Sequence, residues 1–145
     1  FYFFNFYKKK YGSDLNFYPG VGVDNMEALI SLALGYGRDF IVLADDDAAG
    51  RAAVKRYRRE FLLSNSCYVY GEVDKRFKGK KLEGLISNKT KAEIRKYFGI
   101  KKLQKRHFAL FFAEKSSVLD YELDEETRGN VSTLLQKLRS MFQAT

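Results

Sequence analysis

The sequence is poor in residues that many catalytic and structural sites require. It has one cysteine, Cys67, one histidine, His107, and one proline, Pro19, in 145 residues. A single cysteine can form neither an internal disulfide nor a cysteine-based metal cage. We expect His107 to be a packed or surface residue rather than a catalyst. The scarcity of cysteine fits a reducing compartment, so we predict a cytoplasmic protein.

Long apolar runs are also lacking. No run approaches the ~18 residues of a membrane-spanning helix, and no signal peptide is recognisable, so we expect no membrane partner. The apolar opening, residues 1–7, is short and is followed rather than preceded by lysines. We expect it to belong to a core, not to a base-stacking platform. Because Phe1 begins inside this stretch, we also expect the chain to be part of a longer protein.

The charge balance is basic. The formal net charge is +8, while 46% of the residues are hydrophobic and 16% are aromatic. This composition predicts a packed globular fold. The positive charge favours a polyanionic partner, nucleic acid first, although a basic surface can also simply keep a domain soluble.

Alternating apolar runs and amphipathic segments predict an α/β fold, a parallel sheet flanked by helices with a helical C-terminal tail. The first half predicts helices and strands at 1–11 (helix, or a strand), 15–18 (strand), 25–34 (helix capped by Asp24), 40–44 (strand), 48–63 (helix) and 67–70 (strand). The second half predicts a helix that begins with a capping box of Thr90 and Glu93 and ends at Gly99, and further helices over 102–115 and over 125–142. We therefore divide the chain into an α/β core, 1–87, and a helical extension packed on it, 88–145.

Three aspartates follow the buried strand 40–44. In extended backbone, Asp45 and Asp47 can face the same cleft, and Gly50 follows three residues later. The carboxyl end of a parallel strand is where α/β folds place ligands, and Mg²⁺ prefers carboxylate oxygens. The alternative is that the aspartates only cap the next helix. The run of three favours metal binding, while Asp46 could instead point inward or cap.

An apolar strand followed by Asp45-x-Asp47-x-x-Gly50 resembles the second motif of Toprim domains. The wider context is most similar to the OLD (overcoming lysogenization defect) family of ATP-dependent endonucleases. This similarity rests on four further segments: 19–25, 35–40, 82–86 and 105–109. Toprim domains also carry a glutamate after their first strand. That strand and its glutamate would lie upstream of Phe1, so the resemblance implies an incomplete N-terminus.

The resemblance implies a metal-dependent nuclease that cleaves phosphodiester bonds. Mg²⁺ or Mn²⁺, two ions in a complete site, would be held by Asp45, Asp47 and Glu83. Lys105 would neutralise charge that develops on the phosphate, or it is simply a solvated lysine. Glu72 and Asp74 are reserve ligands with an equally plausible surface role.

Basic residues cluster after the acidic motif. We expect six of them to contact a nucleic-acid backbone: Arg51, Lys55, Arg58, Lys78, Lys80 and Lys81. DNA is expected in preference to RNA, and an ATPase domain of the same longer chain is an expected partner, since no Walker motif occurs here. A homodimer is compatible with the sequence. The competing interpretation is a degenerate, non-catalytic Toprim module that binds nucleic acid or scaffolds a complex. A primase or topoisomerase ranks lower.

Overall fold

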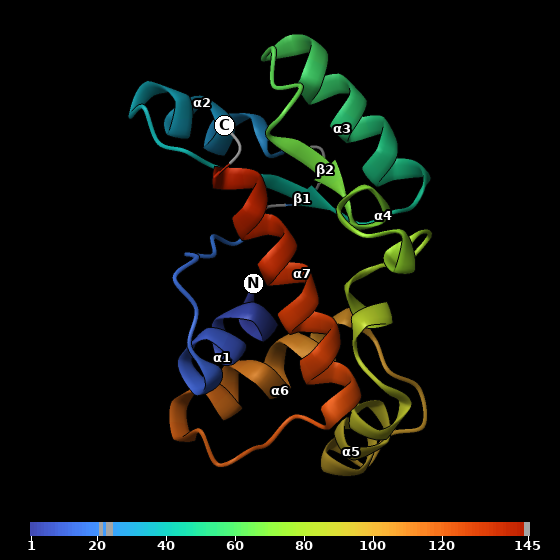
Figure 1. Ribbon diagram of the computed structural model, residues 1–145. Coiled ribbons are helices and arrows are strands. Elements are labelled where there is room, and N and C mark those ends of the chain that lie inside the picture. Colours follow the sequence, from blue (N-terminus) through green and yellow to red (C-terminus); the bar gives the residue numbers. More distant parts are fainter. Residues whose placement is uncertain (21, 23–24, 144–145) are drawn as a thin grey trace. The chain divides into compact units, whose positions relative to one another are not determined.

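The computed structural model describes residues 1–20, 22 and 25–143, and it is a mostly helical α/β fold (Figure 1). Over these residues it has seven α-helices, two 3₁₀ helices and a two-stranded parallel sheet. In chain order the elements are α1 Tyr2–Tyr11, α2 Glu27–Gly35, β1 Val42–Ala44, α3 Ala48–Glu60, β2 Cys67–Val69, α4 Tyr70–Val73, η1 Lys75–Phe77, η2 Leu82–Leu85, α5 Asn88–Phe98, α6 Lys105–Val118 and α7 Glu125–Gln143. Within the described part of the chain, no helix is long and apolar enough to cross a membrane.

The chain forms two compact units, and each combines two separate stretches of sequence. The helical unit comprises Phe1–Pro19 and Ile86–Val131, and the sheet unit comprises Gly20–Leu85 and Ser132–Thr145. Helix α7 begins in the helical unit and ends in the sheet unit. The domain boundary expected from the sequence, between residues 87 and 88, stays a prediction.

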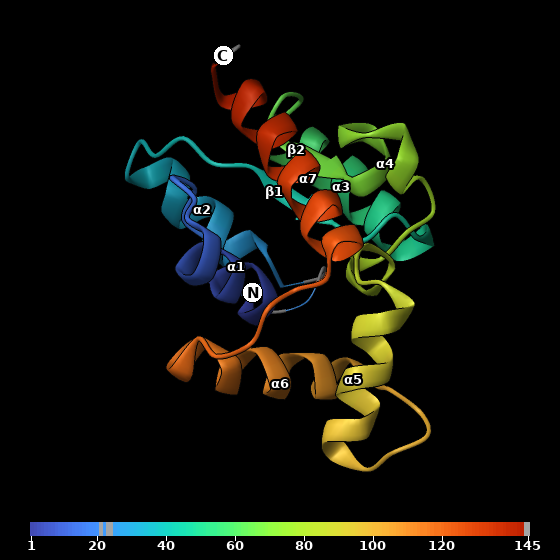
Figure 2. The same cartoon turned by 60° about the horizontal axis from the view of Figure 1, so that its bottom comes forward.

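The sheet unit is built around β1 and β2. The two strands run parallel, with Val42 opposite Cys67 and Ala44 opposite Val69. These four side chains face one side of the sheet and form a core with residues of α2, α3 and the loop before β2: Ile30, Ala53, Val54, Tyr57 and Leu63. Figures 1 and 2 both show the sheet between α3 and the C-terminal half of α7. The predicted parallel pairing of the two apolar strands is thus confirmed.

The elements of the sheet unit are shorter than their apolar runs. Leu43 is only half-buried, so the second face of β1 is less covered than the continuous apolar run indicated. Helix α3 ends at Glu60 rather than at residue 63, and Leu62 has a positive φ of 55°. A left-handed residue cannot continue a right-handed helix, which explains the early end.

The helical unit has an aromatic core. Phe3 and Phe6 of α1 lie against Phe112 of α6, with ring centroids 4.7 and 5.5 Å apart. All three rings are buried. The prediction that the aromatic opening is core is therefore confirmed.

Several local predictions were wrong. Residues 15–18 form no strand, since no neighbouring strand pairs with them. Helix α5 is capped by Ser87, whose hydroxyl accepts from the Thr90 amide at 3.1 Å, so Thr90 lies inside the helix. The predicted cap Asp24 lies outside the described residues.

Candidate functional site

The triple aspartate occupies the turn between β1 and α3 in the sheet unit. Asp47 is the N-cap of α3, and its Oδ1 accepts from the Gly50 amide at 2.8 Å. The capping interpretation is therefore correct for Asp47. A cap uses one carboxylate oxygen, and the other, Oδ2, lies 2.9 Å from the Lys81 ammonium. The same side chain thus has both a structural and an electrostatic contact.

Asp46 points inward, which is one of the two alternatives predicted for it; the other was a helix cap. It is 5% exposed and accepts from the Gly79 amide at 2.7 Å and from the Arg51 guanidinium at 2.6 Å. The hydrogen bond from the Gly79 amide has the largest effect, and it lowers the pKa of Asp46. Together with the hydrogen bond and the charge of Arg51, it outweighs burial, which acts to raise this pKa. The space is tight, because a Cβ atom on Gly71 would lie 2.3 Å from Asp46 Oδ2. Asp46 therefore anchors the loop and is no candidate ligand.

Asp45 faces the segment that leads into η2. Its Oδ1 accepts from the Leu82 amide at 3.1 Å. Burial raises the pKa of the neighbouring Tyr70 phenol, and the charges of Asp45 and Glu83 raise it further. Both carboxylates therefore lie within electrostatic reach of the Tyr70 hydroxyl.

Glu83 has the least satisfied carboxylate in this region. It lies in η2, and its Oε2 is buried without a hydrogen-bond partner among the described residues. Leaving a buried carboxylate oxygen unpaired is costly, so such an atom calls for a proton or a cation. This orphaned oxygen is the feature of the region that would suit a divalent metal ion.

Lys81 is the cation that pairs with Asp47. Its hydrogen bond to Asp47 is the largest cause of its raised pKa, followed by the charges of Asp47, Asp45 and Glu83. The contact that the structure shows is the one between Lys81 and Asp47, while Asp45 and Glu83 act on Lys81 through their charge alone. Among residues 1–20, 22 and 25–143, no group of three or more His, Cys, Asp or Glu side chains is arranged to hold a metal ion.

The other predicted acidic and catalytic residues have separate places. Glu72 accepts from the Val69 amide and pairs with Arg58, and Asp74 accepts from the amide and the guanidinium of Arg76. Both reserve ligands therefore serve local structure. Lys105 is the first residue of α6 in the helical unit, and its role beside the carboxylates stays a prediction.

The six predicted nucleic-acid contacts differ in their surroundings. Arg51 is bound to Asp46, and Arg58 donates to both Glu72 and the Cys67 carbonyl. Lys55 and Lys78 are exposed. The Lys80 ammonium lies 5.9 Å from the centre of the Phe77 ring. Arg51 and Lys81 are also exposed, but each is paired with an aspartate, which leaves Lys55 and Lys78 as the residues best placed to meet a polyanion.

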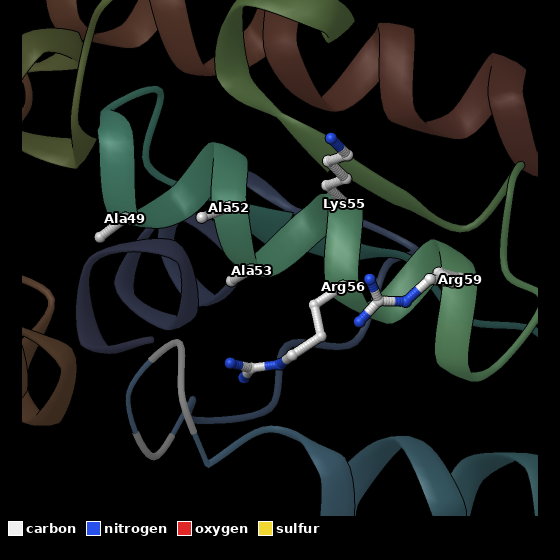
Figure 3. A pocket seen from close by; sticks show the side chains of 6 residues that line it. All are labelled: Ala49, Ala52, Ala53, Lys55, Arg56 and Arg59. Carbon is white, nitrogen blue, oxygen red and sulfur yellow. The ribbon is translucent and has the colours of Figure 1, made fainter.

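A shallow pocket of about 430 Å³ runs along α3. Figure 3 shows its lining, three alanines beside three cations: Ala49, Ala52, Ala53, Lys55, Arg56 and Arg59. Arg56 also lies 3.6 Å from Glu27 of α2, and Arg59 lies 3.2 Å from Glu60. The pocket extends the basic surface of α3 around Lys55.

Sequence reasoning missed the connection between the aspartates and the loop Lys78–Leu82. It assigned Lys81 to nucleic acid and left the loop amides without a role. The glycine and lysines of Lys78-Gly79-Lys80-Lys81 were the available signal, because such a turn presents amides and ammonium groups that suit carboxylates. What the local pattern could not supply is the pairing of Asp47 with a residue 34 positions away.

Comparison with models of protein families, with curated proteins and with solved structures gives no match. The function of the site is therefore argued from its residues and geometry.

Proposed function

We propose that this chain is a metal-dependent nuclease domain that cleaves phosphodiester bonds of nucleic acid. The observation that carries the proposal is the pair of acidic residues Asp45 and Asp47 in the turn that follows β1, where Asp47 Oδ2 lies 2.9 Å from the Lys81 ammonium. With Glu83 they make up the carboxylate cluster of this proposal. The buried, unpaired Oε2 of Glu83 supports the need for a further cation. Carboxylates at the end of a parallel strand are suitable ligands for Mg²⁺ or Mn²⁺.

Each residue of the cluster has a distinct part in this proposal. Asp45 and Asp47 would hold the ion from the end of β1, and Glu83 would hold it from η2. The chemistry that Mg²⁺ or Mn²⁺ supplies in such sites is polarisation of the phosphate and activation of water. Lys55 and Lys78, which are exposed, would contact the phosphate backbone. DNA is the proposed substrate.

The pattern Asp45-x-Asp47-x-x-Gly50 supports a relationship to Toprim nucleases of the OLD family. Under this proposal, the Toprim glutamate and an ATPase domain would belong to the same longer protein, which would work in the cytoplasm. The parallel pairing of β1 and β2 is compatible with a Toprim sheet.

The proposal is tested by nicking of supercoiled plasmid in Mn²⁺ and in Mg²⁺ by the natural polypeptide that carries this sequence. Asp45→Asn, Asp47→Asn and Glu83→Gln remove one charge each while they keep the side-chain shape. Asparagine is as good a helix cap as aspartate, so Asp47→Asn should fold normally. We expect each variant to lose nicking by on the order of 100-fold or more, as loss of a major electrostatic contact to the reaction commonly does.

Glu60→Gln is the matched control, since this exposed carboxylate pairs only with the neighbouring Arg59 among the described residues. It should nick at the rate of the parent. Full activity in the three cluster variants, or equal loss in the control, would contradict the proposed site.

A second candidate is a non-catalytic module that binds nucleic acid. The observation that favours it is that the aspartates already have hydrogen-bond or ion-pair partners within the protein. Asp46 is buried, Asp47 caps α3, and Asp45 and Asp47 contact the loop that carries Lys81. In that case plasmid would be bound but not nicked in Mn²⁺. Fluorescence anisotropy with labelled DNA in EDTA measures this binding independently of cleavage.

A further inference from the structure

Lys81 makes different contacts from the two other lysines of its loop, Lys78 and Lys80. Its ammonium lies 2.9 Å from Asp47 Oδ2, and its side chain is 49% exposed. Lys80 instead lies over the Phe77 ring, and Lys78 acts on the buried Asp46. Lys81 is thus the lysine of this loop that pairs with Asp47 while it keeps access to solvent.

The backbone around Lys81 is fixed on both sides by the triple aspartate. On one side Asp46 accepts from the Gly79 amide at 2.7 Å and donates its own amide to the Lys80 carbonyl at 2.9 Å. On the other side Asp45 accepts from the Leu82 amide at 3.1 Å. With the backbone held, the long Lys81 side chain can leave Asp47 by rotation about its own bonds toward solvent.

A divalent ion and the Lys81 ammonium would compete for the same oxygen. Asp47 Oδ1 is used by the Gly50 amide of the helix cap, and Oδ2 is the atom that Lys81 contacts. An ion that bound Asp47 through Oδ2 would therefore meet a like charge at contact distance, which is unfavourable.

We propose that Lys81 is a built-in counter-ion of the carboxylate cluster, which divalent metal must displace from Asp47 before the site is loaded. The lysine pairs with Asp47 in the metal-free protein and sets the metal concentration at which the site fills. This inference rests on the proposed function, because it takes Asp45, Asp47 and Glu83 as the ligands.

The test is Mn²⁺ binding measured by isothermal titration calorimetry on the natural polypeptide that carries this sequence. Lys81→Met removes the charge and keeps the aliphatic stem, and Lys80→Met makes the same change one residue away. We expect Lys81→Met to bind Mn²⁺ about fivefold or more tightly than the parent, the lower end of typical coupling between two linked ligands. Lys80→Met should stay within about twofold, since the Lys80 ammonium lies over the Phe77 ring and its charge can act on the carboxylates only at a distance, where salt screens it.

A double-mutant cycle with Asp47→Asn assigns the effect to the contact itself. The gain from Lys81→Met should vanish in the Asp47→Asn background. Equal affinities of the parent and Lys81→Met would overturn this inference and leave the proposed metal site standing, as would an equal gain in Lys80→Met. Absence of Mn²⁺ binding in every variant, with normal thermal unfolding, would overturn the proposed metal site as well.

Discussion

Gly50 packs directly against the backbone of Asp45. A Cβ atom on Gly50 would lie 1.9 Å from the Asp45 carbonyl oxygen, far closer than any side-chain carbon can approach a backbone oxygen. The first turn of α3 therefore sits against the end of β1, and only glycine permits this approach. The glycine of Asp45-x-Asp47-x-x-Gly50 thus has a steric reason that is independent of any catalytic role.

Gly50→Ala should destabilise the protein despite the higher helix propensity of alanine. The contact atom belongs to the backbone and cannot move aside, so we expect a loss of about 2 kcal/mol or more in the free energy of unfolding, as overpacking typically costs. Urea unfolding followed by circular dichroism measures it.

Gly129→Ala is the matched control for this prediction. Gly129 lies within α7, and a Cβ atom there would meet nothing within 4 Å. It should stabilise the protein by up to about 1 kcal/mol, the difference in helix propensity. Equal effects of the two substitutions would contradict the steric account of Gly50.

The sequence predicted those features of the sheet unit that depend on local pattern. The apolar run 40–44 and the aspartates after it indicated a buried strand followed by a helix, and both are present as β1 and α3. The run 15–18 also contains large apolar side chains, but it has no strand to pair with, and it is irregular. Strand formation requires a partner, which the local sequence does not reveal.

The candidate site was only partly predicted, because the local sequence does not reveal contacts between residues that are far apart in the chain. Asp45 and Asp47 stand out because of their spacing, whereas the role of Lys81 depends on a contact across 34 residues. Competing local signals caused another error: Ser87 and Thr90 both precede helix-forming residues, and it is Ser87 that caps the helix, by accepting from the Thr90 amide. Only the tertiary structure contains that information.

Asp47 is both the cap of α3 and a proposed metal ligand, and two different substitutions separate these roles. Asp47→Ala removes the bond to the Gly50 amide and should cost about 1 kcal/mol in the free energy of unfolding. Asp47→Asn retains an acceptor for that amide and should cost a few tenths of a kcal/mol at most. Both should reduce Mn²⁺ binding. If Asp47→Asn destabilised the protein as much as Asp47→Ala, the cap would not explain the loss.

Arg58 and Lys55 lie three residues apart on α3 and should behave oppositely. Arg58 donates at 2.6 Å to the Cys67 carbonyl and pairs with Glu72 at 3.0 Å, so it fixes α3 to β2 and α4. Arg58→Ala should therefore lower the free energy of unfolding by about 2 kcal/mol, as hydrogen bonds to charged groups indicate. Lys55→Ala should change it by less than about 0.5 kcal/mol.

For nucleic-acid binding, we expect Lys55→Ala to have a larger effect than Arg58→Ala. Lys55 is exposed beside the pocket of Figure 3, so Lys55→Ala should weaken DNA binding and reduce the slope of log affinity against log salt by about 1. Fluorescence anisotropy at several salt concentrations measures this slope. An unchanged slope in Lys55→Ala would remove this residue from the proposed DNA surface.

Asp124 makes the helical unit sensitive to acid. Three hydroxyl groups donate to its Oδ1 within 2.8 Å, those of Ser87, Thr90 and Thr127. Burial acts to raise the pKa of Asp124, but these bonds outweigh it and lower the pKa from 3.8 to about 2. The ionised form is therefore favoured by folding.

The sign of the pH dependence follows from that lowered pKa. The stabilisation by Asp124 should be fully present above pH 3.8 and should be lost as the pH falls toward about 2. We expect it to amount to about 1–2 kcal/mol, because solvent screens a half-buried carboxylate. Thermal unfolding of the parent and of Asp124→Asn should be compared between pH 5 and pH 2, about 3 pH units that include both pKa values. The difference between the two melting temperatures reports the contribution of the ionised carboxylate. The two melting temperatures should converge as the pH falls, and a constant difference over this interval would show that the network stabilises the fold without favouring the ionised carboxylate.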